Sequence, residues 1–391
     1  MGVGMPTKAK ITAFIGAVAI IMLIRLIFFS NAGAAVFKPA AEAAQQLTYA
    51  YDSGASFYSF NSKGYYFCTK DGVKFLSSKD EQQWDEPINL TNPVLYGKCD
   101  ILAVSEPKGR AAYVFNALGK LMECKFDAPI LNFSVNRSGD LTVILRTSSG
   151  YRVEAYAPGF DGPVWRYVMV KPNIYPISAD TSPDGRVTAI SALDLAPGAG
   201  AGITTRIMFM YTNETDAMDL GGTDGVFAGE TLPGQIARIY FMNNRLLAVS
   251  DKSISAYDLS GKNQVKKSWE LPLTNRISRF CTYGEAGFAF ITGGALEGGG
   301  KAQEPGTLNF YNMSGRRTGT YAAGAGADYL SMNWDGAIAG DGRNFYAVNK
   351  RGGLLWQYKS PMDLKQLIFI DNENTALYAG STNASVMRRG A

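Results

Sequence analysis

The sequence predicts an all-β domain that follows a single membrane-spanning helix. Three observations lead to this prediction. The chain of 391 residues contains 43 glycines and 21 residues each of Tyr and Phe, and many glycines lie in turns between short aromatic and β-branched runs. A unit of roughly 40 residues recurs along most of the chain. One uninterrupted apolar segment, residues 11–29, lies close to the N-terminus.

The apolar segment has the length of a transmembrane helix. Residues 11–29 (ITAFIGAVAIIMLIRLIFF) contain one charged residue, Arg25. A helix of this length spans roughly 28 Å, about the thickness of the hydrocarbon layer. Lys8 and Lys10 precede it, and the preference for positive charge on the cytoplasmic side places residues 1–10 in the cytoplasm. We therefore expect a single-pass cell-membrane protein whose C-terminal domain is extracytoplasmic.

A cleaved signal peptide is the alternative interpretation of this segment. Residues 31–35 (NAGAA) contain the small-residue pattern that is typical of cleavage sites. The apolar run is longer than the hydrophobic core of most signal peptides, which favours an uncleaved signal-anchor. Residues 30–46 then form a linker, and residues 47–391 form the exported domain under either interpretation.

The repeat consists of two hairpins. The first hairpin has a turn centred on Gly or Asn and is found at 101–115, 131–145, 177–191, 330–340 and 367–381. The second often has an aromatic residue in its last strand and is found at 153–167, 254–271, 308–321 and 345–358. The aromatic residues at comparable positions are Trp165, Trp269, Tyr321 and Trp356. The glycines expected in the turns are Gly109, Gly139, Gly185, Gly261, Gly315, Gly336 and Gly353.

One such unit cannot bury both faces of its small sheet, whereas units stacked around an axis cover one another. The repeat therefore predicts a β-propeller, in which the repeated aromatic residues pack between blades. The predicted blades are 55–90, 97–128, 130–170, 175–221, 236–273, 277–322, 328–360 and 364–388. The last has material for three strands, and residues 47–51 (LTYAY) could supply the fourth and close the ring. Eight blades are therefore favoured over seven.

Two motifs of the repeat resemble those of known propeller families. The segments 257–269 (YDLSGKNQVKKSW) and 182–186 (SPDGR) resemble quinoprotein-like and WD-like propeller repeats. That resemblance implies the fold, and it stops there, because a quinoprotein dehydrogenase needs adjacent cysteines and no Cys-Cys pair occurs. No cofactor is expected. The whole chain also resembles single-pass, membrane-anchored bacterial propeller proteins, a resemblance that implies no activity.

The composition excludes several kinds of chemistry. The chain has no histidine, which removes His-based triads, His acid–base catalysis and His-ligated metal sites. Acidic turns such as Asp180–Asp184 are read as ordinary turn chemistry, so neither metal ligands nor catalytic residues are assigned. Cys68, Cys99, Cys124 and Cys281 match no zinc spacing and are read as buried thiols. If one disulfide forms, Cys99 with Cys124 is favoured by proximity in the sequence.

The exported domain carries almost no net charge. Of the 38 basic residues, Lys8, Lys10 and Arg25 lie before or within the apolar segment, and the rest nearly balance the 34 acidic residues. Nothing in this distribution indicates a nucleic-acid partner. Glycine-rich stretches at 197–202 and 293–300 interrupt the repeat and are read as rim loops suited to adaptable contacts.

We expect a non-catalytic interaction scaffold that binds an envelope protein or a cell-wall polymer. The alternative is a small-ligand sensor, or a carboxylate-based enzyme, that uses the central channel. A third interpretation is a resemblance to the propeller lipoprotein that assists outer-membrane protein assembly, but this chain has no lipidated cysteine after its apolar segment. The sequence alone leaves the identity of the partner, the binding face and the biological process open.

Overall fold

The computed structural model describes residues 35–36, 48–50, 54–60, 63–171, 173–195, 203–212, 225–250, 253–259, 264–293, 305–324, 326–371 and 373–388. In these ranges the chain forms strands β1 to β33 and no α-helix, so none of the described elements is a helix able to cross a membrane. The predicted transmembrane segment 11–29, and all of the predicted linker 30–46 except β1 (Ala35–Val36), lie outside these ranges.

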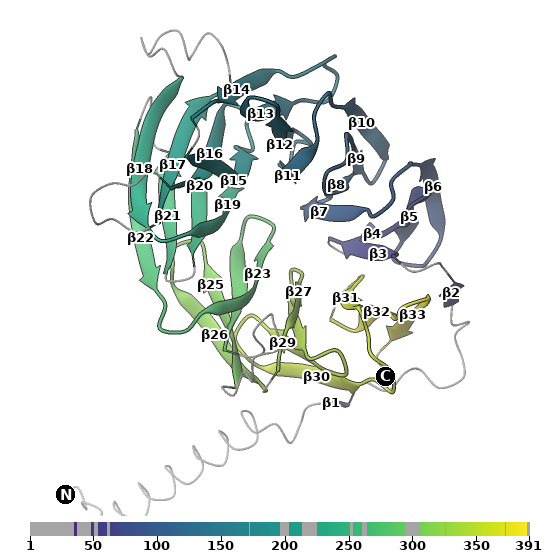
Figure 1. Cartoon of the computed structure of the whole chain (residues 1–391). Helices are drawn as coiled ribbons and strands as arrows, with labels where there is room; N and C mark the ends of the chain where they lie inside the picture. The colour runs from purple at the N-terminus through teal and green to yellow at the C-terminus, as the bar shows by residue number, and fades with distance from the viewer. Residues whose placement is uncertain are drawn as a thin grey trace, which may run out of the picture.

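The strands form eight sheets around one axis, which makes the domain an eight-bladed β-propeller (Figure 1). Blade 1 comprises β3 (Ser56–Ser59), β4 (Gly64–Cys68), β5 (Gly72–Ser77) and β6 (Gln82–Pro87). Blade 2 comprises β7 (Val94–Lys98), β8 (Ile101–Ser105), β9 (Ala111–Asn116) and β10 (Gly119–Lys125). Blade 3 comprises β11 (Ile130–Val135), β12 (Leu141–Thr147), β13 (Gly150–Tyr156) and β14 (Trp165–Met169). Blade 4 comprises β15 (Ile174–Thr181), β16 (Val187–Asp194), β17 (Thr204–Tyr211) and β18 (Val226–Pro233).

The second half of the ring repeats this order. Blade 5 comprises β19 (Ile236–Met242), β20 (Arg245–Ser250), β21 (Ser253–Leu259) and β22 (Val265–Pro272). Blade 6 comprises β23 (Ile277–Tyr283), β24 (Gly287–Thr292), β25 (Gly306–Asn312) and β26 (Arg317–Gly324). Blade 7 comprises β27 (Tyr329–Met332), β28 (Gly336–Gly340), β29 (Asn344–Asn349) and β30 (Leu354–Lys359). Blade 8 comprises β31 (Gln366–Phe369), β32 (Thr375–Ala379), β33 (Asn383–Arg388) and β2 (Thr48–Ala50). In each blade the first strand in this order lies nearest the axis (Figure 1).

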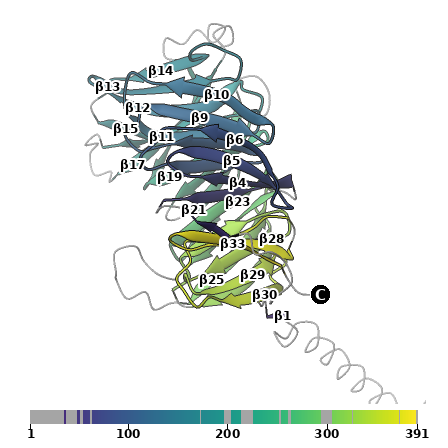
Figure 2. The same ribbon diagram turned by 90° about the vertical axis from the view of Figure 1, so that its right-hand side faces the viewer.

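The ring is closed by the two ends of the domain. β2 pairs antiparallel with β33, with Thr48 opposite Ser385 and Ala50 opposite Asn383. The sequence-based predictions of eight blades, and of closure by residues 47–51, are therefore confirmed. β1 adds a short parallel strand to the outer edge of blade 7 beside β30. Figure 2 shows β1 beside β30, in the same part of the view as β28 and β29 of blade 7.

One blade boundary was predicted wrongly. Blade 4 was expected to end at residue 221, but its outer strand β18 runs from Val226 to Pro233 and pairs with β17. The other seven predicted blades enclose the observed sheets to within a few residues. Blade 4 differs because residues 213–224, which lie outside the described ranges, separate its third and fourth strands.

The hydrophobic core lies between the blades. Each of the eight clusters of buried side chains draws on two neighbouring blades, so every blade interface has its own core. Because side chains alternate between the two faces of a strand, β9 contributes side chains to two of these cores. Its Tyr113 and Phe115 join the cluster with blade 1, whereas Ala112 and Val114 join the cluster with blade 3. Burial on both faces explains why the middle strands are almost continuously apolar.

The structure places the repeated aromatic residues on the outermost strands. Trp165, Trp269, Tyr321 and Trp356 lie on β14, β22, β26 and β30. Trp356 is fully buried between blades 7 and 8, and its Nε1 donates to the Glu373 carbonyl at 2.7 Å. The other three are partly buried against the cores shared with the next blade. Trp84, which the sequence analysis did not single out, makes a similar hydrogen bond from blade 1 to Ala117 of blade 2 at 3.0 Å.

Only some of the predicted turn glycines adopt a turn conformation. Gly139, Gly185 and Gly315 have φ of 92°, 73° and 73°, the left-handed conformation that a tight turn requires. At two other turns a neighbour has this conformation, Lys108 instead of Gly109 and Gly352 instead of Gly353. Gly336 lies in β28, where a Cβ atom would come within 2.1 Å of the Val348 carbonyl oxygen. Gly261 lies outside the described residues.

All four cysteines are free thiols, so the Cys99–Cys124 disulfide considered above does not form. Cys68 and Cys124 are buried, whereas Cys99 and Cys281 are partly buried.

Candidate functional site

A buried ion pair joins two innermost strands beside the propeller axis. Lys98 at the end of β7 and Asp180 in β15 join blades 2 and 4, with Nζ and Oδ2 3.1 Å apart and side chains only 5% and 0% exposed. Asp180 also accepts hydrogen bonds from the Phe241 amide at 2.7 Å and the Ser134 hydroxyl at 3.0 Å. One carboxylate therefore connects the innermost strands of blades 2, 3, 4 and 5.

Tyrosine side chains surround this ion pair. Burial raises the pKa of Tyr58, Tyr96 and Tyr240 on three innermost strands, so all three hydroxyls remain protonated and uncharged at neutral pH. The Tyr58 hydroxyl donates to the Cys99 carbonyl at 2.8 Å and so links blade 1 to blade 2. These uncharged hydroxyls come from the innermost strands of blades 1, 2 and 5.

Hairpin turns meet at one end of the axis. The Tyr283 and Trp334 rings lie edge to face at 4.3 Å between centroids. The Lys350 ammonium lies 4.3 Å from the Tyr283 centroid and 5.1 Å from that of Trp334. Arg137 of blade 3 pairs with Glu285 of blade 6, with Nη1 and Oε2 2.6 Å apart. The ion pair joins blades 3 and 6, whereas the aromatic and cation–π contacts join the neighbouring blades 6 and 7, and Trp334 remains 47% exposed.

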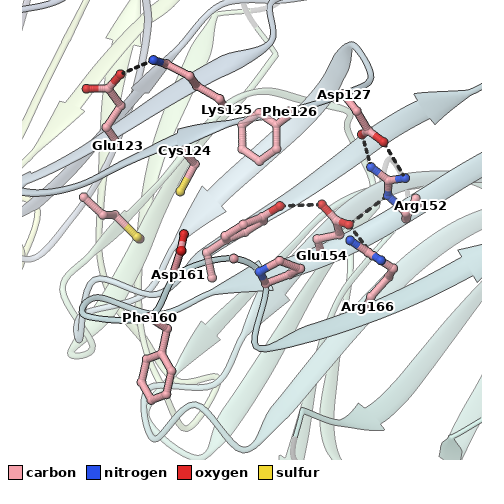
Figure 3. A pocket seen from close by; sticks show the side chains of 14 residues that line it. Glu123, Cys124, Lys125, Phe126, Asp127, Arg152, Glu154, Phe160, Asp161 and Arg166 are labelled. Atoms are coloured by element: carbon pink, nitrogen blue, oxygen red, sulfur yellow. Dashed lines mark hydrogen bonds and ion pairs between the residues drawn. The ribbon is translucent and has the colours of Figure 1, made fainter.

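A groove of about 610 Å³ lies away from the axis, between the outer parts of blades 2 and 3 (Figure 3). Its lining residues are Met122 to Asp127 on and after β10, Arg152, Glu154 and Tyr156 on β13, Phe160 to Pro163 in the following loop, and Arg166 on β14. Side chains alternate between the two faces of β13. Arg152, Glu154 and Tyr156 face blade 2 and line the groove, while Tyr151 and Val153 face blade 4.

A buried carboxylate organises the groove. Glu154 is 1% exposed, and Arg166 lies directly opposite it in the β13–β14 register. The Glu154 Oε1 atom lies 2.5 Å from Arg166 Nε and 2.9 Å from Arg152 Nε, and Oε2 accepts the Tyr156 hydroxyl at 2.7 Å. Figure 3 shows Arg152 and Arg166 converging on Glu154. The cost of burying this carboxylate is therefore offset by hydrogen bonds from Arg166 and Tyr156 and by the ion pair with Arg152.

Asp127 extends this network to the rim. Arg152 pairs with Asp127 through both of its terminal nitrogens. The hydrogen bond from Arg152 lowers the pKa of Asp127, and the same bond raises that of Arg152, so both groups remain ionised at neutral pH. Charges on this side of the groove balance, since two arginines face two carboxylates.

The groove has an apolar floor beside these charges. Cys124 and Phe126 are each 7% exposed and belong to the core between blades 2 and 3, as does Tyr156. Burial raises the pKa of Cys124 to about 11, so its thiol is protonated at neutral pH and is not a nucleophile there. Phe160 at the rim is 70% exposed. This combination is suited to binding by hydrogen bonds and apolar contact.

The sequence analysis missed this groove. Its signal is the pattern Arg152-x-Glu154-x-Tyr156, which puts two opposite charges on one face of an otherwise apolar strand. The loops it favoured instead, 197–202 and 293–300, lie outside the described residues except for Gly293. Asp180, read as part of an acidic turn, is instead the partner of Lys98.

Comparisons with solved structures show the fold. The chain is similar to BamB from Moraxella catarrhalis, with a TM-score of 0.51 and 12% identity over 90% of this chain and 100% of that one. It is also similar to Raptor from Chaetomium thermophilum, with a TM-score of 0.48 and 8% identity over 92% of this chain and 29% of that one. A third similar structure is the Cps50 (Swd1) β-propeller domain of Myceliophteria thermophila, with a TM-score of 0.46 and 11% identity over 88% of this chain and 99% of that one.

No curated protein sequence matches the chain. A family model does match it, over residues 40–388, which is nearly the whole of the propeller and part of the segment that precedes it. By this match the chain belongs to the family of unknown function DUF5711.

Proposed function

We propose that the chain is a non-catalytic interaction scaffold, anchored in the cell membrane by residues 11–29, with its propeller outside the cytoplasm. In this proposal the propeller binds an envelope protein or a cell-wall polymer. The observation that carries it is the groove itself, which opens on the side of the propeller and places the exposed ring of Phe160 and the half-exposed guanidinium of Arg166 beside an apolar floor.

The chemistry of the groove supports binding over catalysis. Glu154 accepts hydrogen bonds from Tyr156 and Arg166 and pairs with Arg152, and Cys124 is protonated, so neither is free to act as a base or a nucleophile. Phe160 and Arg166 are of the residue types that contribute most to protein interfaces, together with Trp and Tyr. A rigid ring of interlocked blades can present such a surface without rearrangement on binding.

Crosslinking in intact cells tests the proposal. A membrane-impermeant amine crosslinker is added, the full-length protein is captured by an affinity tag, and crosslinked partners are identified by mass spectrometry. We expect a reproducible envelope partner, with a reduced yield for Phe160→Ser, because the exposed ring can be removed without opening a cavity. Met362→Ser is the matched control, since Met362 is a 43% exposed apolar residue between blades 7 and 8. Equal loss of the partner in both variants would argue against the groove.

A small-ligand sensor or carboxylate-based enzyme that uses the central channel is the second candidate. Arg238 favours it, because this residue lies on the innermost strand β19, is exposed, and has no carboxylate within ion-pair distance among the described residues. Native mass spectrometry of the purified protein distinguishes the two functions. A bound small molecule that is lost in Arg238→Gln would favour the channel and would count against the scaffold.

A further inference from the structure

Arg166 is held in place through one nitrogen, and its other N–H donors are available for binding. Its side chain is 51% exposed, and its Nε is held at 2.5 Å by the buried carboxylate of Glu154. Within the described part of the chain only this nitrogen has a hydrogen-bond partner. A guanidinium has five N–H donors in a fixed planar fork. The terminal nitrogens of Arg166 are therefore oriented by Glu154 and available to a ligand.

The ligand group that matches this fork is a planar oxyanion. A carboxylate accepts two parallel hydrogen bonds from one guanidinium, which makes the pair both strong and directional. The other cations of the groove are already engaged, Arg152 by Asp127 and Glu154, and Lys125 by Glu123 with Nζ and Oε1 3.5 Å apart. Arg166 is thus the group in this groove best prepared to receive a carboxylate.

The apolar floor indicates what accompanies the carboxylate. Cys124, Phe126 and Tyr156 lie beside the charged network, and the cavity of about 610 Å³ is within the range of ligand-binding grooves. In an extended segment the side chains at positions i and i+2 point the same way. A segment lying along the groove can place an acidic side chain on Arg166 and a large apolar side chain, two residues away, on this floor.

We propose that the groove between blades 2 and 3 binds an extended segment of a partner protein through an internal Asp or Glu that pairs with Arg166. The proposal rests on the scaffold function and names the chemistry of its partner. An apolar residue two positions from the acid packs on Cys124, Phe126 and Tyr156. Asp161, at the end of the groove away from Arg166 (Figure 3), disfavours a second acid there.

Selection from a random peptide library tests this specificity. The library is displayed with blocked C-termini, and the target is the full-length protein in detergent micelles. We expect the enriched peptides to share an acid and a large apolar residue two positions apart. Synthetic copies with amidated ends should lose at least tenfold in affinity when Glu is replaced by Gln. Enriched peptides without an acid, or no enrichment at all, would overturn the proposal.

Variants of Arg166 distinguish the contribution of the guanidinium geometry from that of the positive charge. Arg166→Met should weaken the selected peptides at least tenfold, and Arg166→Lys should weaken them severalfold, because lysine keeps the charge but not the fork. Arg343→Met is the matched control and should leave affinity within twofold, because Arg343 lies outside the groove, its side chain is 58% exposed, and its Nε lies 2.6 Å from an Asp363 carboxylate oxygen. Thermal unfolding of each variant verifies that the propeller is intact. Equal binding by Arg166→Met and the parent protein would refute the assignment.

Further measurements show which group supplies the anion, and whether a negative result counts against this inference or against the scaffold function. If peptides bind only with a free C-terminal carboxylate, or if inorganic phosphate competes equally well, the internal acid is ruled out. If the partner crosslinked in cells is retained by Arg166→Met, this inference fails while the scaffold function stands. If the peptides bind as expected but intact cells give no envelope partner, the scaffold function fails instead.

Discussion

Replacing Asp180 by Asn should destabilise the propeller more than any surface charge substitution. The change leaves the Lys98 ammonium, 5% exposed, without a counter-ion in the axis. At 3.1 Å and an effective dielectric constant of about 20, the attraction that is lost is about 5 kcal/mol. Removing one partner of a buried pair costs about 3–5 kcal/mol in free energy of unfolding. We expect Asp180→Asn to fall within that range.

Differential scanning calorimetry measures this loss. An unfolding entropy of about 2.1 cal/mol/K per residue, over a domain of roughly 340 residues, converts 3–5 kcal/mol into a Tm decrease of roughly 4–7 °C. The matched control is Asp85→Asn, because Asp85 pairs with Lys74 at 2.9 Å with both side chains about two-fifths exposed. An exposed pair contributes about 0–1 kcal/mol, so this variant should move Tm by little more than 1 °C.

A double-mutant cycle with Lys98→Met isolates the ion pair from its surroundings. The double variant should be more stable than the sum of the two single losses predicts, because neither charge is then left alone. Strictly additive losses, or an Asp180→Asn Tm equal to that of Asp85→Asn, would show that the axial pair does not hold the four blades together.

Other substitutions test other parts of the structure. Trp356→Ala should cost about 3–5 kcal/mol by urea unfolding, because it empties a fully buried site, and Trp165→Ala should cost less because Trp165 is partly exposed. Gly336→Ala should cost about 1–3 kcal/mol in the same assay, since the new Cβ meets the Val348 carbonyl. Burial raises the pKa of Cys68 and Cys281 to about 12, so iodoacetamide at pH 8 should modify neither until the protein is unfolded, as read by mass spectrometry. These two pKa values are higher in the folded protein than in the unfolded chain, so both thiols contribute to the free energy of unfolding while they stay protonated. That contribution is present below about pH 9 and is lost as the pH rises through 12, which urea unfolding at several pH values would detect.

The fold was predictable because each blade carries its own signals. Hairpin patterns recur along the chain and turn glycines recur in most units, so the error in one blade did not change the architecture. The fourth strand of blade 4 was misplaced because a local pattern cannot show that β17 and β18 pair across a long intervening segment. Turn conformation was only partly predictable, since the left-handed residue can be the neighbour of the glycine, as at Lys108.

The groove and the axial ion pair could not be predicted in the same way. Lys98 and Asp180 are 82 residues apart and meet only because the ring brings blades 2 and 4 around one axis. The groove needs β10 of one blade to face β13 and β14 of the next, and Glu154 meets Arg166 only in the observed hairpin register. Such sites depend on relations between blades, which no single repeat encodes.

Site-specific photocrosslinking in living cells tests most directly whether the groove is the partner-binding surface of an extracytoplasmic scaffold. A photoreactive phenylalanine analogue replaces Phe160 at the groove rim or, as the control, Met362 near blade 8. We predict that light links the Phe160 position, and not the Met362 position, to one envelope protein through a segment that contains Asp or Glu. Identical crosslinks from both positions, or none from Phe160 while other surfaces capture the partner, would contradict the assignment of function to this groove.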